Sequence, residues 1–123
     1  MNFKCFFMVL SAMMLAACSN TGTITPTLTP IEEQGQAVYN LRCAQCHALT
    51  PDTVVIGPSL AGVATRAASR MPGYDTQAYL ETSILIPDEY LVEGFTNTMP
   101  TNFGKELTSE EFSALIAYLM TLK

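Results

Sequence analysis

The sequence is poor in the imidazole and thiol groups that bind zinc. Its 123 residues include one histidine and four cysteines, and only one closely spaced cysteine pair, Cys43 and Cys46, lies beside that histidine, His47. A structural zinc site needs four nitrogen or sulfur ligands, usually from two such pairs. The missing second pair and the missing second histidine therefore argue against zinc.

Several other features are also absent. There is no internal repeat, no run of like charge and no pattern typical of a catalytic dyad. No apolar run reaches the roughly 20 residues that a membrane-spanning helix needs. Eleven acidic residues outnumber six basic ones, for a net charge of −5. This acidic balance argues against nucleic acid as a partner, because nucleic-acid-binding surfaces are basic.

The motif "CAQCH" is the strongest signal for chemistry. Cys43, Cys46 and His47 stand at positions i, i+3 and i+4, which a helix would present on one face. This spacing is typical of covalent c-type haem attachment, in which both thiols add to haem vinyl groups and the imidazole becomes an axial iron ligand. A thioredoxin-like redox pair would follow a strand, whereas helix and turn patterns flank this motif. A plain disulfide remains an alternative.

The N-terminus has the pattern of an export signal. Residues 1–17 contain one basic residue, Lys4, and a short apolar run that ends in small residues, which predicts a signal peptide. "LAAC" resembles the bacterial lipobox, so we expect Cys18 to be lipidated and to become the first residue of the mature chain. The alternative is ordinary cleavage near Ala17, which would leave a free thiol. Lipidation at Cys18 would place the protein at the outer face of a bacterial membrane.

Residues 18–30 form a different kind of segment. They are rich in Thr and Pro and contain little that could be buried, so we predict a solvated tether. Residues 31–123 then form one small domain, which is marginal for a core built from side chains alone. A covalent haem would supply much of the missing apolar core.

The pattern of this domain predicts an all-α fold. We expect helices over 31–46, 74–86 and 107–123, because each stretch combines apolar residues at helical spacing with a start or stop signal. The last helix has a candidate N-cap at Thr108 or Ser109. Prolines and glycines predict loops over 50–63 and 93–106.

The domain resembles a monohaem cytochrome c of the small mitochondrial and bacterial type. The resemblance rests on the haem motif, on "GPSLAG", and on four positions where the terminal helices of that family cross: Gly35, Tyr39, Leu115 and Tyr118. It implies a small cytochrome c fold and one covalent haem c. It also implies that the Pro58 carbonyl accepts a hydrogen bond from His47, which would orient the ligand. Residues 87–98 depart from the family pattern, so no roles are carried over there.

A methionine sulfur is the expected sixth iron ligand, because a Met/His pair raises the reduction potential of a cytochrome c. Met99 and Met71 are both followed by proline, and Met120 lies within the last helix as a packing residue. We predict Met99, which precedes the final helix where the family supplies its sulfur. Met71 remains the rival.

The resemblance implies electron transfer rather than enzymatic turnover. Arg66, Arg70, Tyr74 and Tyr90 are candidates for bonding the haem propionates. The C-terminal half resembles cytochrome c domains of respiratory complexes, including domains fused to oxidase subunits and the lipoprotein cytochrome of alternative complex III. We therefore expect redox protein partners in such a complex. The alternatives are a lipid-anchored shuttle, or a haem sensor or peroxidase-like protein with an open sixth position.

Overall fold

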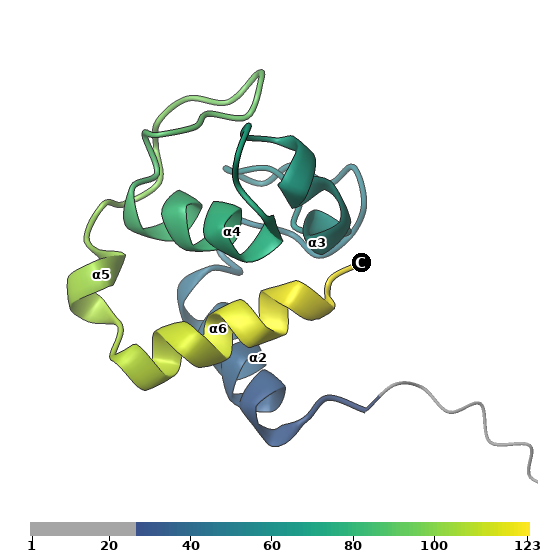
Figure 1. Cartoon of the computed structure of the whole chain (residues 1–123), viewed down its shortest axis with the longest axis vertical. Coiled ribbons are helices and arrows are strands. Elements are labelled where there is room, and N and C mark those ends of the chain that lie inside the picture. The colour runs from purple at the N-terminus through teal and green to yellow at the C-terminus, as the bar shows by residue number, and fades with distance from the viewer. Residues whose placement is uncertain (1–26) are drawn as a thin grey trace, which may run out of the picture.

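Six short helices joined by loops make up the described part of the chain, residues 27–123 of a computed structural model (Figure 1). The elements are α2 (Pro30–Arg42), α3 (Val63–Arg66), the 3-10 helix η1 (Ala67–Ser69), α4 (Thr76–Leu85), α5 (Phe103–Glu106) and α6 (Ser109–Thr121). Residues 27–123 contain no strand, only one isolated bridge between His47 and Val54. The predicted all-α fold is therefore confirmed.

The predicted export and anchoring signals lie outside the described residues. These are the signal peptide over residues 1–17, the lipidation site Cys18 and the tether as far as residue 26. Among the helices of residues 27–123, none is long and apolar enough to cross a membrane.

The two longest helices, α2 and α6, cross and pack against each other, as Figure 1 shows. Gly35 of α2 makes the crossing possible, because a Cβ atom there would lie 1.9 Å from the Ala114 carbonyl oxygen and 2.6 Å from Tyr118 Cβ. Next to this contact, the rings of Tyr39 and Tyr118 pack with their centroids 5.8 Å apart. The predicted crossing of the terminal helices is thus present, and only glycine permits this approach of the two backbones.

Side-chain caps fix where α4 and α6 begin. The Thr108 hydroxyl accepts a hydrogen bond from the backbone N–H of Glu111 (3.1 Å), and the Glu111 carboxylate accepts one from the backbone N–H of Thr108 (2.9 Å). This reciprocal pair satisfies two N–H groups that a helix start leaves free. At α4, the Asp75 carboxylate accepts from the N–H of Ala78 (2.8 Å). At α6, the two bonds between Thr108 and Glu111 show that the N-cap is Thr108 rather than Ser109.

The start of α2 is held in a similar way. The Glu32 carboxylate accepts hydrogen bonds from the backbone N–H of Thr29 (2.6 Å) and from its hydroxyl (2.8 Å). These bonds favour the charged form, the backbone bond most, and they lower the pKa of Glu32 below its ordinary value. Because the pKa is lowered on folding, this contribution to stability is present near neutral pH and is lost as the pH falls through the folded-state pKa.

The end of α2 differs from the sequence prediction. We expected the helix to continue through the haem motif to residue 46, but it ends at Arg42. The Tyr39 carbonyl accepts from the N–H groups of both Cys43 (2.8 Å) and Ala44 (3.0 Å), which interrupts the regular helical ladder. A separate turn follows, in which the Cys43 carbonyl accepts from His47 (2.9 Å). The motif is therefore a tight turn after the helix.

The core lies between α6 and the remaining helices. Its buried side chains are Tyr39, Val63, Ala67, Tyr79, Leu80, Ile84, Leu107, Ala114, Leu115, Ile116, Tyr118 and Leu119. Leu115, which is 1% exposed, and Leu119 also line the cavity described next. The face of α6 that packs in the core thus forms one wall of the site.

Candidate haem site

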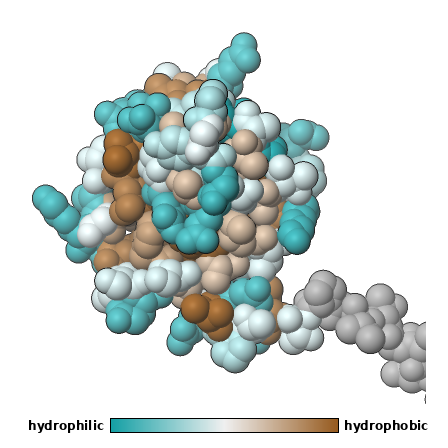
Figure 2. Space-filling view, viewed as in Figure 1, coloured by the Kyte–Doolittle hydropathy of each residue, from teal (hydrophilic) through white to brown (hydrophobic). Residues whose placement is uncertain are grey.

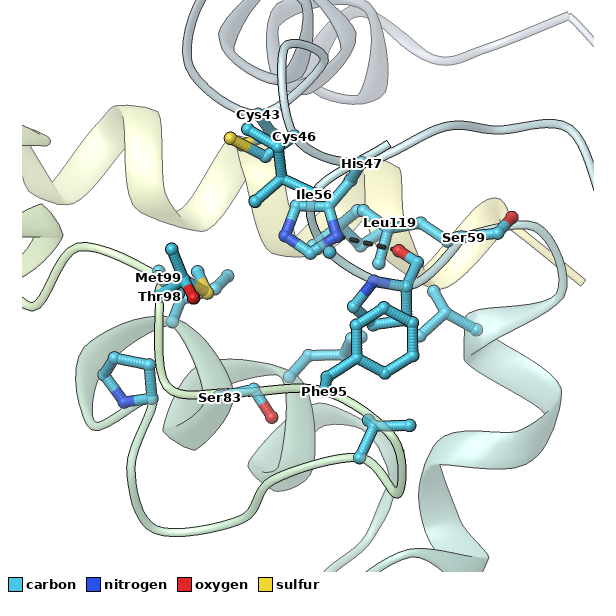
Figure 3. Close-up of a pocket in the computed structure, with 18 of the residues that line it drawn as sticks. Cys43, Cys46, His47, Ile56, Ser59, Ser83, Phe95, Thr98, Met99 and Leu119 are labelled. Carbon is cyan, nitrogen blue, oxygen red and sulfur yellow. Dashed lines mark hydrogen bonds between the residues drawn. The ribbon is translucent and has the colours of Figure 1, made fainter. Parts of the chain in front are cut away.

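A cavity of about 290 Å³ opens between the haem motif, α4, α6 and the loop before α5. Figure 3 shows side chains from these segments converging on it. Its lining is mainly apolar and includes Ile56, Leu60, Val63, Tyr79, Leu80, Ile84, Leu91, Val92, Phe95, Phe103, Leu115 and Leu119. All of its sulfur-bearing side chains come from the haem motif and from Met99, whereas its other polar side chains, such as Arg66, Arg70 and Ser83, come from several segments.

The two cysteines of the motif line one side of this cavity. Cys43 and Cys46 are both half-buried, and no disulfide joins them. Burial raises the pKa of the Cys43 thiol to about 11, with a further contribution from the neighbouring Cys46. The position therefore favours an uncharged sulfur. A thioether is uncharged, whereas a zinc-bound or redox-active cysteine needs the thiolate.

His47 is held with one ring nitrogen turned away from the cavity. Its Nδ1 lies 2.8 Å from the Pro58 carbonyl oxygen (Figure 3). A carbonyl can only accept, so Nδ1 carries the proton of this bond, and in the neutral ring Nε2 is then the nitrogen with the lone pair. The backbone of His47 is fixed as well, because its carbonyl accepts from the Tyr39 hydroxyl (2.6 Å). Both bonds leave Nε2 available as a metal ligand.

Gly57 allows the loop before Pro58 to lie against the His47 ring. A Cβ atom at Gly57 would fall 2.4 Å from His47 Cε1. The backbone N–H groups of Ile56 and Gly57 donate to the Cys46 carbonyl (3.2 and 2.9 Å), so the loop is tied to the haem motif itself. The sequence offered a signal for Gly57, since it directly precedes Pro58, but only the structure shows what its missing side chain does.

Met99 lines the same cavity as His47, while Met71 does not. Figure 3 shows Met99 and His47 facing each other across the open space, each from its own loop. All three methionines, Met71, Met99 and Met120, pack as partly buried side chains against the hydrophobic core, so the cavity lining is what distinguishes Met99. Of the three methionines in residues 27–123, Met99 alone is in the lining.

The candidate propionate ligands separate into two groups. Arg66, Arg70 and Tyr90 line the cavity, whereas Tyr74 does not. The Arg66 guanidinium donates to the carbonyls of Ser59 and Ala61 and so ties the loop after Pro58 to α3. Burial, together with the nearby Arg70, lowers the pKa of Arg66 from its ordinary value.

Ser83 is a cavity residue that the sequence analysis missed. Its side-chain oxygen is buried and has no hydrogen-bond partner among the described residues. In the sequence Ser83 is only a single serine on the face of α4 that also carries Tyr79, Leu80 and Ile84, and the structure shows that all four line the cavity. A buried hydroxyl without a partner is costly, so this one indicates a further group in the cavity beside it.

The residues present fit a covalently bound haem. Two cysteine sulfurs, an imidazole ring and a thioether sulfur surround a mainly apolar cavity that contains one unpaired hydroxyl. No group of three or more His, Cys, Asp or Glu side chains in residues 27–123 is placed to hold a metal ion by itself.

The fold and the site define a small, all-α haem protein with one haem attachment motif. Comparison with known proteins agrees: the Cytochrome c family model matches residues 32–123. The chain is 32% identical to cytochrome c2 iso-1 of Magnetospirillum molischianum over 91 residues, which cover 67% of this chain and 91% of that protein. It is 30% identical to cytochrome c of Euglena viridis over 98 residues, which cover 74% and 96%.

The chain therefore belongs to the cytochrome c family, as a monohaem class I c-type cytochrome. Membership means that it carries a covalently attached haem c and transfers electrons.

Proposed function

We propose that this cytochrome is a lipid-anchored electron carrier in which His47 and Met99 are the two axial ligands and Cys43 and Cys46 are the attachment sites. The observation that carries the proposal is that Met99 and His47 line one cavity, whereas Met71 packs outside it. When bound, the haem supplies a reversible one-electron couple at its iron.

The protein's own contribution is to hold its ligands in fixed orientations. The Pro58 carbonyl keeps the proton of His47 on Nδ1, and Gly57 lets the loop press against the ring. Cys43 and Cys46 would hold the group on the same side as His47. Because these parts follow each other within a few residues and are tied together by backbone hydrogen bonds, the site needs little rearrangement when its charge changes.

The apolar walls favour electron transfer over substrate chemistry. Side chains such as Leu80, Leu115 and Leu119 line the cavity, and among the described residues its lining contains no Asp or Glu side chain that could form an acid–base pair with His47. With His47 and Met99 both bound to the iron, no site would be open for oxygen or peroxide. We therefore infer that the chain is a carrier and turns over no substrate of its own.

The proposed location rests on the N-terminal sequence. A signal peptide over residues 1–17 and a lipidated Cys18 would anchor the chain at the outer face of a bacterial membrane. Lipidation of a bacterial lipoprotein cysteine adds more than one acyl chain, which makes anchoring durable, because each buried CH₂ contributes about 0.8 kcal/mol. The tether up to residue 30 would let the domain reach about 35 to 40 Å from the lipid.

Changing Cys18 to Ser should release the protein from the membrane. Without the acyl chains, most of the protein should move from the membrane pellet to the soluble fraction after a salt and carbonate wash. Cell fractionation followed by haem staining measures this. A Cys5→Ser variant, altered inside the signal peptide, is the matched control and should stay in the pellet. A Cys18→Ser protein that also stays there would show that protein contacts, not lipid, hold it.

A respiratory complex is the proposed partner. The anchor already prevents free diffusion, and the C-terminal half resembles the cytochrome c domains of quinol-oxidising or oxidase complexes. The membranes are extracted with a mild detergent and separated by native electrophoresis. The haem-stained protein should migrate with a large complex that still oxidises quinol or reduces oxygen, in low and in high salt. Migration as a small separate band at every salt concentration would instead support a lipid-anchored shuttle.

A further inference from the structure

Negative charge is concentrated in one segment of the domain. Residues 27–123 carry eleven carboxylates and five basic side chains, so their net side-chain charge is −6. Between Arg70 and Lys105 there are five carboxylates and no basic residue, so residues 71–104 account for −5 of that total. This segment contains α4, the loop after it and Met99. The rest of the described domain is close to neutral.

Exposed apolar side chains lie within the same segment. Leu85 is 42% exposed, Ile86 52% and Leu91 46%. Figure 2 shows hydrophobic surface over the C-terminal end of α4 and the loop beyond it. Three exposed carboxylates, Asp88, Glu89 and Glu93, alternate with these residues along the chain. We call the six residues together the α4-loop face.

The α4-loop face is ordered rather than a loose loop. The backbone N–H of Glu89 donates to the Ile86 carbonyl (2.9 Å), which turns the chain back toward α4. The Tyr90 ring then packs edge-on against Tyr79 of α4, with centroids 5.8 Å apart. The face is thus presented in a fixed shape, which lowers the entropy cost of binding.

The face is also continuous with the haem cavity. Tyr90, Leu91, Val92 and Phe95 line that cavity, although Leu91 is also part of the exposed face. A partner seated here would be separated from the cavity by little more than these side chains. Arg42, which also lines the cavity, is exposed but lies 3.8 Å from Glu106 and so has a negative neighbour.

We propose that the α4-loop face docks a redox protein whose own contact surface carries Lys or Arg side chains around an apolar centre. The inference rests on the proposed electron-carrier function and names the site and the chemistry of its partner. Charge complementarity would steer the encounter, and the exposed leucine and isoleucine side chains would provide the apolar contact. A second copy of this chain is a poor occupant, because three carboxylates would face three carboxylates. Anionic lipid headgroups would be repelled for the same reason.

Two small oxidants of opposite charge test the inference. Tris(phenanthroline)cobalt(III) is a trication with an apolar surface, and hexacyanoferrate(III) is a polar anion. Each accepts one electron from the reduced haem iron, so cobalt(III) becomes cobalt(II) or ferricyanide becomes ferrocyanide. The second-order rates are measured by stopped flow on the full-length, detergent-solubilised cytochrome, together with the reduction potential of each variant.

The Glu89→Gln/Glu93→Gln variant should be oxidised about fourfold more slowly by the cobalt complex and severalfold faster by hexacyanoferrate, and both differences should shrink at high salt. The matched control, Glu33→Gln/Glu110→Gln, removes the same charge from the first turns of α2 and α6, away from the cavity lining. It should change either rate by less than about twofold. Ile86→Ser should slow the cobalt complex alone, because it removes apolar contact without changing charge.

Different outcomes test the docking face and the electron-carrier function on which it rests. Equal rate changes in the two Gln variants would overturn the α4-loop face as the docking site, while rapid oxidation by either probe would still support an electron carrier. Failure of both probes to oxidise the reduced protein would contradict the carrier function itself. If sedimentation shows dimers that Ile86→Ser dissociates, the face is a contact between copies and the inference is wrong.

Discussion

A Cys43→Ala/Cys46→Ala variant is expected to lose all covalently bound haem. Both thiols line the cavity beside His47, and neither is engaged in a disulfide. Without them no thioether can form, so acidified organic solvent should extract any haem that remains. The apolar cavity would also lose its permanent occupant, and a domain of this size depends on that occupant for part of its core. We therefore expect the variant to accumulate poorly and to lose helical signal.

Denaturing electrophoresis with haem staining measures this effect. The wild-type band should stain and the double variant should not, while each single variant should keep a weaker band through its remaining thioether. Peptide mass spectrometry of the wild type provides a readout that does not depend on how well a variant folds. One peptide containing both Cys43 and Cys46 should carry one intact haem. A peptide with two free thiols, or haem staining that persists in the double variant, would exclude these attachment sites.

Met99→Ala should produce the next largest effect. Met99 lines the same cavity as His47, so this change removes the proposed sulfur ligand and leaves the proposed attachment sites, Cys43 and Cys46, unchanged. The weak far-red sulfur-to-iron band of the oxidised protein should disappear. The reduction potential should fall on the order of 0.1 to 0.3 V, within the roughly 0.8 V that axial ligands span.

Met71→Leu is the matched control, because it also removes a half-buried methionine followed by proline. Met71 packs on the hydrophobic core rather than in the cavity, and leucine has a similar volume. We expect the far-red band to remain and the potential to change little. The opposite pattern, with the band lost in Met71→Leu and kept in Met99→Ala, would make Met71 the ligand.

Much of the fold could be predicted because its signals are local. The capping pair of Thr108 and Glu111 and the Asp75 cap mark helix starts within four residues. Gly35 followed from the family resemblance, and the structure shows the backbone contact that requires it. The end of α2 was predicted wrongly. The helix ends because the Tyr39 carbonyl accepts hydrogen bonds from two N–H groups, those of Cys43 and Ala44, and this arrangement depends on how the following turn packs. The short α5 lies within a predicted loop and has too few residues to show a periodic pattern.

The site residues that are close together in the sequence could be predicted better than those that only the fold brings together. Cys43, Cys46 and His47 form one contiguous motif, so their grouping could be predicted from spacing alone. Met99 and Met71 have the same local context, a following proline, so the prediction of Met99 rested on its place in the family pattern, and in the structure only Met99 lines the cavity. Ser83 was missed because a single serine on an apolar helix face has no chemical meaning until the cavity beside it is known.

Carbon monoxide binding to the reduced native protein tests the central claim most directly, namely that His47 and Met99 close both axial positions of the haem. At neutral pH we expect a low-spin, six-coordinate spectrum that changes little within minutes of adding carbon monoxide, because the gas would have to displace a bound sulfur. The Met99→Ala variant, whose sixth position is open, should bind the gas rapidly and serves as the positive control. A high-spin, five-coordinate spectrum of the native protein, with rapid carbon monoxide binding, would contradict the electron carrier and point to a sensor or peroxidase-like protein.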